Sequence, residues 1–524
     1  MTFKHRNTVR DDSSFSKTDE NDYFVEYNNL LSLAAVELGD NFAAIASPTL
    51  SKQETVTNLH NYICTQARTR KEPIFPWGSL GQFIPRLALA VFNLVYTSLR
   101  FRVKQLPPNS IYFRTWLVPR CFQGEELVDD YFRNLPTDLS RGDNVIVSFQ
   151  PLDYSLLTKT WKLNKKDNYI VAVGLLSITD IFKLMIDYIF TARLQIKGSY
   201  NYKNQDITPA INQSLLLDYL RLRSFQAYQE RYICRKLLKF NLKAFIYVFE
   251  NQSWEKACCS TLNRQDTRLV GYQSSGFSPI FLNFFPTKLD AKIQPMPDVI
   301  LTVGDLFTKY LLDHGNFEIP VRTFAALRFC YPNDGTRYEA LEPNPKLLRK
   351  ILYAFPVQVS QYPATLDNLL KVFANTSIEV DLKFHPILKK REVRAFSSLP
   401  SNFNVVDRID MSRLADTYDL ILFNDNSIGI ESLLMGVRSY QYDTSKRSND
   451  ERFFYFDLWD THLDHVGVTL LRDQILRGSY KKDYDVPAVT DYLNSMYRPY
   501  ATNPHLFFNL IDTQSHVKNI GNTD

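Results

Sequence analysis

Short apolar runs alternate with amphipathic segments along most of the chain. Residues 245–249 and 420–423 are apolar runs typical of buried strands, and stretches with apolar residues at helical spacing follow them. Strands that alternate with helices of about 10–15 residues indicate βαβ units around a mostly parallel sheet. We therefore predict an α/β fold. The same pattern predicts one long amphipathic helix over residues 215–240 and a last strand over residues 438–442.

The same sequence pattern predicts how the chain is divided into domains. Its 524 residues exceed what one hydrophobic core supports, and Pro, Asn, Asp and Gly concentrate at residues 331–345, which is typical of a linker. The predicted division is a disordered tail over 1–22, a helical region over 23–108, Rossmann-like domains over 109–332 and 346–485, and a helical C-terminus over 486–524 that packs back.

Polar residues follow two neighbouring predicted strands of the first domain. Ligands of open α/β sheets bind at the carboxyl ends of the strands, so these residues are candidates for one wall of a cleft. An ordinary turn explains Asn251 but explains the carboxylate of Glu250 poorly. The candidates are Glu250, Asn251, Gln252, Gln273, Ser274 and Ser275.

A strand predicted over residues 378–384 has Lys383 near its end and is followed by His385 and Pro386. Proline suits the first turn of a helix, and the free N–H groups of a helix start favour anions. These residues indicate a phosphate site. The alternative is a histidine with a purely structural role.

Polar residues also follow the strand predicted over residues 420–423. Asn426 and Ser427 are candidate helix caps, and Glu431 falls in the first turns of the helix predicted over 428–435. A capping box is the alternative, but the spacing from Ser427 to Glu431 is one residue longer than that motif requires.

Composition excludes several classes of function. The net charge of +5 comes from 61 basic and 56 acidic residues, without a basic stripe, so nucleic acid is not an expected partner. The six cysteines show no paired spacing, which indicates reduced thiols and no zinc site. The first 22 residues are polar and carry no secretory signal, so we expect a cytoplasmic protein.

Residues 83–104 form the most apolar stretch and end in basic residues. They are too short in uninterrupted apolar sequence for a transmembrane helix. Two interpretations remain open: a helix in peripheral contact with an anionic membrane surface, at its inner face, or a helix buried in a large domain.

Five segments, in order, resemble bacterial surface-carbohydrate biosynthesis proteins. They are FENQSWEKA, GYQSSGFSPIFLNFFP, PMPDVILTVGDLFTKYLLDHG, KFHP and NDNSIGIESLLMG. More broadly, the set resembles the GT-B glycosyltransferases with a His-Pro motif, which include capsule Kdo transferases, polysialyltransferases and CDP-glycerol glycerophosphotransferases. The match spans roughly residues 111–442.

The resemblance implies two Rossmann-like domains that face an interdomain cleft. The second domain would hold a nucleotide-sugar donor, CMP- or CDP-linked, with His385 at the phosphate, Ser427 at a phosphate or carboxylate and Glu431 at the ribose. Glu250 would face a glycan or glycolipid acceptor as general base or nucleophile. No cofactor and no metal ion are implied.

One difference from the sequence pattern of this group affects the expected activity. Members of this group usually carry histidine where this chain has Ser274. The expected function is a transferase that extends a capsule or another surface polysaccharide from a nucleotide-activated sugar. The alternatives are a polyol-phosphate transferase and a catalytically silent assembly partner with the same fold.

Overall fold

The structure is a computed structural model. It describes residues 22–53, 59–60, 63, 76–152, 154–157, 168–262, 267–274, 276–277, 281–328, 349–356, 362–385, 388, 399–407, 409–424, 426–442, 462–463, 465–480, 486–500 and 507–510. Residues 1–21, predicted to be disordered, and the predicted linker at 331–345 lie outside them.

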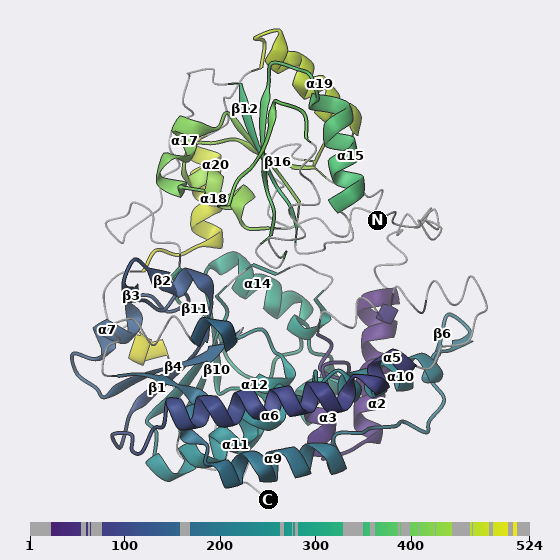
Figure 1. Cartoon of the computed structure of the whole chain (residues 1–524), viewed down its shortest axis with the longest axis vertical. Coiled ribbons are helices and arrows are strands. Elements are labelled where there is room, and N and C mark those ends of the chain that lie inside the picture. The colour runs from purple at the N-terminus through teal and green to yellow at the C-terminus, as the bar shows by residue number, and fades with distance from the viewer. Residues whose placement is uncertain are drawn as a thin grey trace, which may run out of the picture. The chain divides into compact units, whose positions relative to one another are not determined.

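The chain forms two compact units (Figure 1). The N-terminal unit comprises Asp22–Ser275, Phe281–Thr336 and Met496–Asp524, and the C-terminal unit is built mainly from Arg337–Ser495. Each unit is described by itself below.

The N-terminal unit is organised around a seven-stranded sheet in which every neighbouring pair is parallel. Its strand order is β11-β10-β9-β8-β1-β4-β5, so chain order reverses between β1 and β8. The strands are β1 Ile111–Leu117, β4 Val145–Pro151, β5 Tyr169–Val171, β8 Ala244–Val248, β9 Arg268–Tyr272, β10 Val299–Thr302 and β11 Val321–Thr323.

Helices pack around this sheet, and α11 contacts both α9 and α12 (Figure 1). Two short hairpins, β2 Phe122–Gln123 with β3 Glu126–Leu127 and β6 Asn201–Tyr202 with β7 Gln205–Asp206, lie outside the sheet. The helices are α2 Asn28–Glu37, α3 Phe42–Ala46, α5 Trp77–Gly81, α6 Phe83–Arg100, α7 Leu135–Leu139, α9 Ile178–Thr191, α10 Thr208–Leu220, α11 Phe225–Leu237, α12 Ser253–Leu262, α13 Lys288–Ile293 and α14 Asp305–His314.

The single helix predicted over residues 215–240 is wrong. Two helices, α10 and α11, cover the region, and Leu222 between them has a left-handed backbone with φ of 58°. A non-glycine residue in this conformation interrupts a right-handed helix.

A buried ion pair lies inside the N-terminal unit. The guanidinium of Arg114, on the interior strand β1, lies 4.0 Å from the Trp116 ring and 3.9 Å from the Trp254 ring. Its Nε donates to Oε1 of Glu230 on α11 at 3.0 Å, and both charged side chains are only 1% exposed. Because a buried charge is costly without a partner, each group requires the other. The pair therefore joins α11 to the sheet.

The C-terminal segment of the chain returns to the N-terminal unit. The backbone of Arg498 donates to Val303 O at 2.7 Å, and its carbonyl accepts from Ala326 N at 2.7 Å. Tyr500 donates to Asp138 at 2.8 Å, and the ring of Phe507 packs 5.5 Å from that of Phe324.

The C-terminal unit contains a second parallel sheet, in the order β14-β13-β12-β15-β16-β17. Chain order reverses here between β12 and β15. The strands are β12 Lys350–Ala354, β13 Glu379–Lys383, β14 Phe403–Val405, β15 Leu420–Phe423, β16 Ser439–Tyr442 and β17 His462–Leu463.

Helices cover both faces of this sheet. Figure 1 shows α15 (Tyr362–Phe373) and α19 (His465–Leu476) on one side, and α17 (Leu414–Thr417), α18 (Ile428–Leu434) and α20 (Val486–Met496) on the other. Coverage on both faces explains why β12 and β15 are apolar runs without strict alternation, whereas β13 alternates between polar and apolar residues. The prediction that 438–442 is the last strand is wrong, because β17 pairs with β16.

Both units are thus doubly wound α/β structures with Rossmann-like strand order, which confirms the predicted α/β class with two Rossmann-like domains. Cys121, Cys234, Cys258 and Cys259, the cysteines within the described residues, are buried and free, as expected for reduced thiols. In the part of the chain that the structure describes, no helix is long and apolar enough to cross a membrane.

Candidate functional site

The loop after β8 lies where the strand order of the N-terminal sheet reverses. It contains Glu250, Asn251 and Gln252, whose backbone N–H groups all donate to the carboxylate of Glu255 at 2.9–3.1 Å. Glu255 lies in the first turn of α12 and is 1% exposed. The loop is therefore folded around a carboxylate of the helix that follows it.

Side chains complete this loop. Asn251 has a left-handed backbone, with φ of 52°, and donates from Nδ2 to Asn283 O at 2.7 Å. Asn283 donates in return to Glu250 O, and Trp254 Nε1 donates to Gln252 Oε1 at 3.0 Å. Asn251 is buried and structural, whereas the side chains of Glu250 and Gln252 are half-buried and reach the surface.

The carboxyl of Glu255 has an unusual environment. Burial, followed by the nearby charge of Glu250, raises its pKa well above the ordinary value, and the three backbone N–H groups only partly oppose this rise. Two carboxyl groups thus meet at the reversal point, one buried and one half-buried. Pairs of this kind are typical of sites where one carboxyl must exchange a proton.

Gln273 and Ser274 follow β9. Gln273 is fully buried and joins β9 to β10: its N–H donates to Leu301 O at 2.9 Å, and its Oε1 accepts from Val303 N at 3.3 Å. Ser274 is 1% exposed, and its Oγ has no hydrogen-bond partner among the described residues. Ser275 lies outside the described residues.

A cluster of charged side chains that lies near Glu250 was not predicted from the sequence. Asp130, in the loop that follows β3, is 2% exposed. Three arginines surround it: Arg120 at 3.3 Å, Arg133 at 3.2 Å and Arg328 at 3.6 Å. Three arginines thus share the carboxylate of Asp130, and the carboxyl of Asp129 beside it is also buried.

Asp129 and Tyr131 flank that carboxylate. Burial raises the pKa of Asp129 to about 6, although Tyr131 N and Thr115 Oγ1 donate to it at 2.9 and 2.8 Å. Burial, and then the charge of Glu250, also raises the pKa of Tyr131. The consecutive acidic residues and tyrosine after the first strand were the available signal for this cluster.

In the C-terminal unit, the loop after β15 lies at the reversal point of that sheet. Asn426 Nδ2 donates to Ala354 O at the end of β12 at 3.0 Å, and Asn424 N donates to the same oxygen at 3.4 Å. Ser427 Oγ donates to Glu431 Oε1 at 2.7 Å and makes no cap bond to the backbone of α18. The structure therefore brings Asn426, Ser427 and Glu431 together, and the capping-box alternative fails.

The predicted histidine, His385, lies beside the end of β12. β13 ends at Lys383, whose carbonyl accepts from Phe355 N at 2.9 Å directly after β12. Lys383 Nζ donates to Asp407 O at 2.7 Å, and burial lowers its pKa. His385 is half-buried two residues later, and Pro386 lies outside the described residues. The ends of β13 and β15 thus flank the end of β12.

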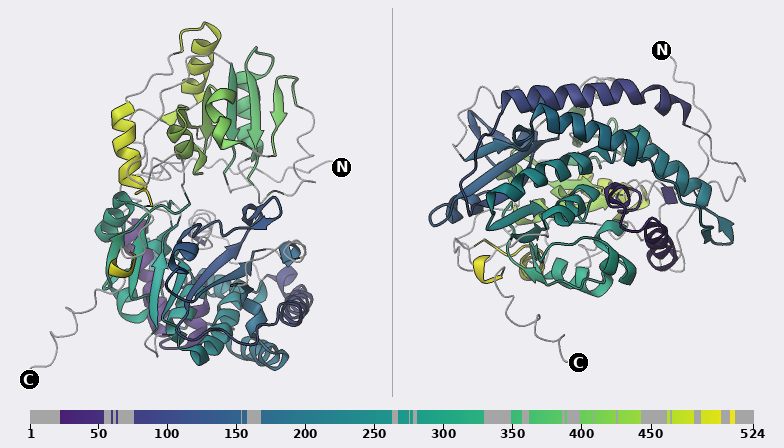
Figure 2. Two further views of the ribbon diagram at one scale, coloured as in Figure 1. Left: turned by 90° about the vertical axis from the view of Figure 1, so that its left-hand side faces the viewer. Right: turned by 90° about the horizontal axis from the view of Figure 1, so that it is seen from below.

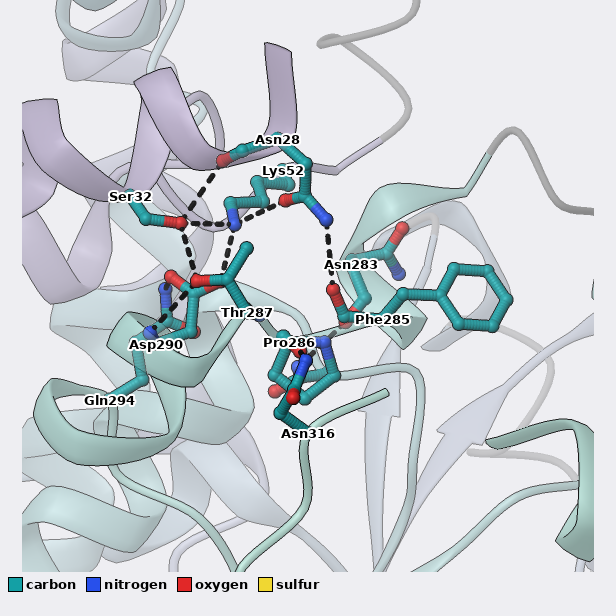
Figure 3. Close-up of polar contacts among 11 residues, drawn as sticks. Asn28, Ser32, Lys52, Asn283, Phe285, Pro286, Thr287, Asp290, Gln294 and Asn316 are labelled. Carbon is teal, nitrogen blue, oxygen red and sulfur yellow. Dashed lines mark hydrogen bonds and ion pairs between the residues drawn. The ribbon is translucent and has the colours of Figure 1, made fainter. Parts of the chain in front are cut away.

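Figure 3 shows a further polar network in the N-terminal unit. Lys52 is 2% exposed and donates to Asn28, Ser32 and Asp290, so that its three protons all have acceptors. Asp290 also accepts from Thr287 N and Oγ1, a capping box at the start of α13. The network joins α2 to α13. No group of three or more metal-binding side chains occurs among the described residues.

The sequence matches no family model and no curated protein. Solved structures similar to this chain include a UDP-N-acetylglucosamine 2-epimerase from Rickettsia bellii (12% identity, 75% of this chain and 94% of that one, TM-score 0.44). They also include the calicheamicin glycosyltransferase (11%, 74% and 93%, 0.40) and a UDP-GlcNAc 2-epimerase from Neisseria meningitidis bound to UDP-GlcNAc (10%, 76% and 98%, 0.38).

We predict that Glu255→Gln reduces the pH dependence of stability. A carboxyl whose pKa is raised in the folded state binds more protons there than in the unfolded state, so stability falls as pH rises from the unfolded pKa toward the folded one. Each unit of pKa difference corresponds to about 1.4 kcal/mol. Urea unfolding at pH 4.5–8 should show a smaller decline for the variant than for the wild type.

Glu126→Gln, which changes an exposed glutamate of the same unit, is the matched control and should follow the wild type. Parallel pH profiles for the wild type and Glu255→Gln would show that Glu255 is not the proton-binding group.

Proposed function

We propose that the protein is a glycosyltransferase that moves a sugar from a nucleotide-activated donor to a glycan or glycolipid acceptor. One observation carries the proposal. In each of the two parallel sheets, the polar residues selected from the sequence follow a strand beside the reversal of strand order: Glu250 after β8, and Asn426 and Ser427 after β15. Ligands of doubly wound sheets bind at this position.

In this proposal the C-terminal unit holds the donor. His385 and Lys383 contact its phosphates, because Lys383 ends β13, His385 lies two residues later, and both can donate hydrogen bonds to an anion. Asn426 and Ser427 bind a phosphate or carboxylate, and Glu431 binds the ribose hydroxyls. Since Ser427 donates to Glu431 in the structure, the donor would take over that hydrogen bond.

The N-terminal unit supplies the acceptor side. Glu250 either accepts the proton of the acceptor hydroxyl while that hydroxyl attacks the donor sugar, or is itself the nucleophile. Gln252, Ser274 and Ser275 belong to the acceptor side, with Asn251 and Gln273 holding the loops in place. The transfer proceeds without a metal ion, and positive charge from His385 and Lys383 compensates the leaving phosphate.

The finer proposal is a surface polysaccharide as acceptor and a CMP- or CDP-linked sugar as donor, with the protein in the cytoplasm. A polyol-phosphate transferase is the second candidate. A catalytically silent assembly partner is the third, favoured by Ser274, which replaces the usual histidine and has a buried hydroxyl without a described partner.

The donor site is tested by thermal unfolding with CMP, CDP, UDP, GDP and ADP. We expect one nucleotide to raise the melting temperature, because a ligand of the native state stabilises it by mass action. His385→Ala should remove most of this rise, and His314→Ala, an exposed histidine on α14, should leave it unchanged. A rise that is identical in wild type and His385→Ala would contradict the assignment of His385.

We also propose that α6 and α9 dock on the inner face of an anionic membrane. The two helices lie side by side (Figure 2), and each exposes large apolar residues. The exposed fraction is 65% for Phe92 on α6 and 80% for Phe190 on α9. Basic residues follow at the end of α6, where an anionic surface would attract them. The interpretation of 83–104 as a buried helix therefore holds only for one face of α6.

Flotation with phosphatidylglycerol vesicles tests this docking. The wild type should float with these vesicles and not with phosphatidylcholine vesicles. Phe92→Glu combined with Phe190→Glu should abolish flotation, because charge is costly in the acyl region. Leu312→Glu, which changes a 51% exposed leucine of α14, is the control. A wild type that stays in solution with both lipids would refute membrane docking.

A further inference from the structure

A cavity of about 310 Å³ lies in the N-terminal unit between the segment that carries α2 and α3, the helix α12, and the end of α13. Its walls are mainly apolar, formed among others by Ala35, Ala44, Ile45, Leu50 and Ile293. The polar residues in the lining are Asp40, Ser51, Lys256 and Gln294, and Lys256, near the start of α12, is the one that carries a positive charge.

Lys256 is buried without a counterpart. It is 3% exposed, yet its ammonium makes no hydrogen bond or ion pair with any residue that the structure describes. Lys52, the other deeply buried lysine nearby, donates to three oxygen atoms, including one of Asp290. The remaining contacts of Asp290 come from Thr287 and Gln294. Asp290 thus lies close enough to act on Lys256 through its charge, but its hydrogen bonds go to Lys52, Thr287 and Gln294.

Burial of an ammonium without a partner disfavours its charged form. The pKa of Lys256 is lowered to about 7, mainly by burial and also by the charge of Lys52, while the negative charges of Asp290 and Glu255 oppose this shift. A substantial fraction of this lysine is thus uncharged at neutral pH. The titratable groups around it are Asp40 in the lining, Lys52, Glu255, Cys259 and Asp290.

The composition of the cavity restricts what can occupy it. Its apolar walls accommodate a hydrocarbon or aromatic body, and Lys256 provides a single positive charge for an anion. Asp40, exposed in the same lining, would repel a second negative charge. A neutral ligand would leave the ammonium without a partner.

We propose that this cavity binds a small monocarboxylate with an apolar body, whose carboxylate pairs with the Lys256 ammonium. The site involves no residue of the proposed donor or acceptor sites, and it does not depend on the proposed transfer reaction. Lys256 follows Glu255 directly, so the carboxylate would bind to the helix that also holds the Glu250 loop.

Calorimetric titration of the full chain with hexanoate and with its uncharged analogue hexanamide tests the site. Hexanoate should bind with net proton uptake, seen as a difference in heat between buffers of different ionisation enthalpy. Its affinity should fall at least tenfold from pH 6 to pH 9, because the amine loses its proton in this range. Hexanamide should bind far more weakly, and succinate should bind more weakly than hexanoate.

Lys256→Met should abolish hexanoate binding, and Lys292→Met, which changes an exposed lysine on α13, should preserve it. If Lys256→Met does not fold, the pH dependence of hexanoate affinity and the proton uptake on binding, both measured on the wild type, test the proposal. The proposal is overturned if hexanoate does not bind at millimolar concentration. It is equally overturned if hexanamide binds as well as hexanoate, or if binding takes up no protons.

Discussion

Reversal of strand order in a parallel sheet is the constraint on which both units depend. Where chain order changes direction, the helices that follow the two neighbouring strands leave toward opposite faces, and their loops separate at the carboxyl ends of the strands. This happens between β1 and β8 in one sheet and between β12 and β15 in the other. The backbone atoms there lack sheet partners, so side chains must satisfy them. Glu255 does this for the loop after β8, and Asn426 does it at the end of β12.

Among the described residues of the N-terminal unit, three lysine or arginine side chains are buried, and their surroundings differ. Arg114 is enclosed by two indole rings and paired with Glu230, and Lys52 has three oxygen acceptors. The Arg114 pair joins α11 to the sheet and the Lys52 network joins α2 to α13, and removal of either carboxylate would leave an uncompensated charge. Lys256 lines a cavity and has no such partner. An unpaired buried charge is a cost to stability, and for this reason it is better explained by a ligand than by packing.

Much of the fold could be predicted, because local patterns determine it. The apolar runs at 245–249 and 420–423 correspond to β8 and β15, and the polar residues after them lie where the pattern places them. Contacts between distant segments could not be predicted. Lys52 and Asp290 are 238 residues apart, and Arg114 and Glu230 are 116 apart, so no spacing indicates either pair. The break between α10 and α11 at Leu222 was not predicted, because leucine is not a residue type that indicates a left-handed backbone.

The central claim is that the nucleotide binds at the reversal point of the C-terminal sheet. Hydrogen–deuterium exchange with and without the nucleotide that binds tests it directly, because a bound ligand slows local opening of the backbone it contacts. The account predicts that protection increases in the peptides that follow β13 and β15, which contain His385 and Ser427. Protection confined to other peptides, with these two unchanged, would contradict it.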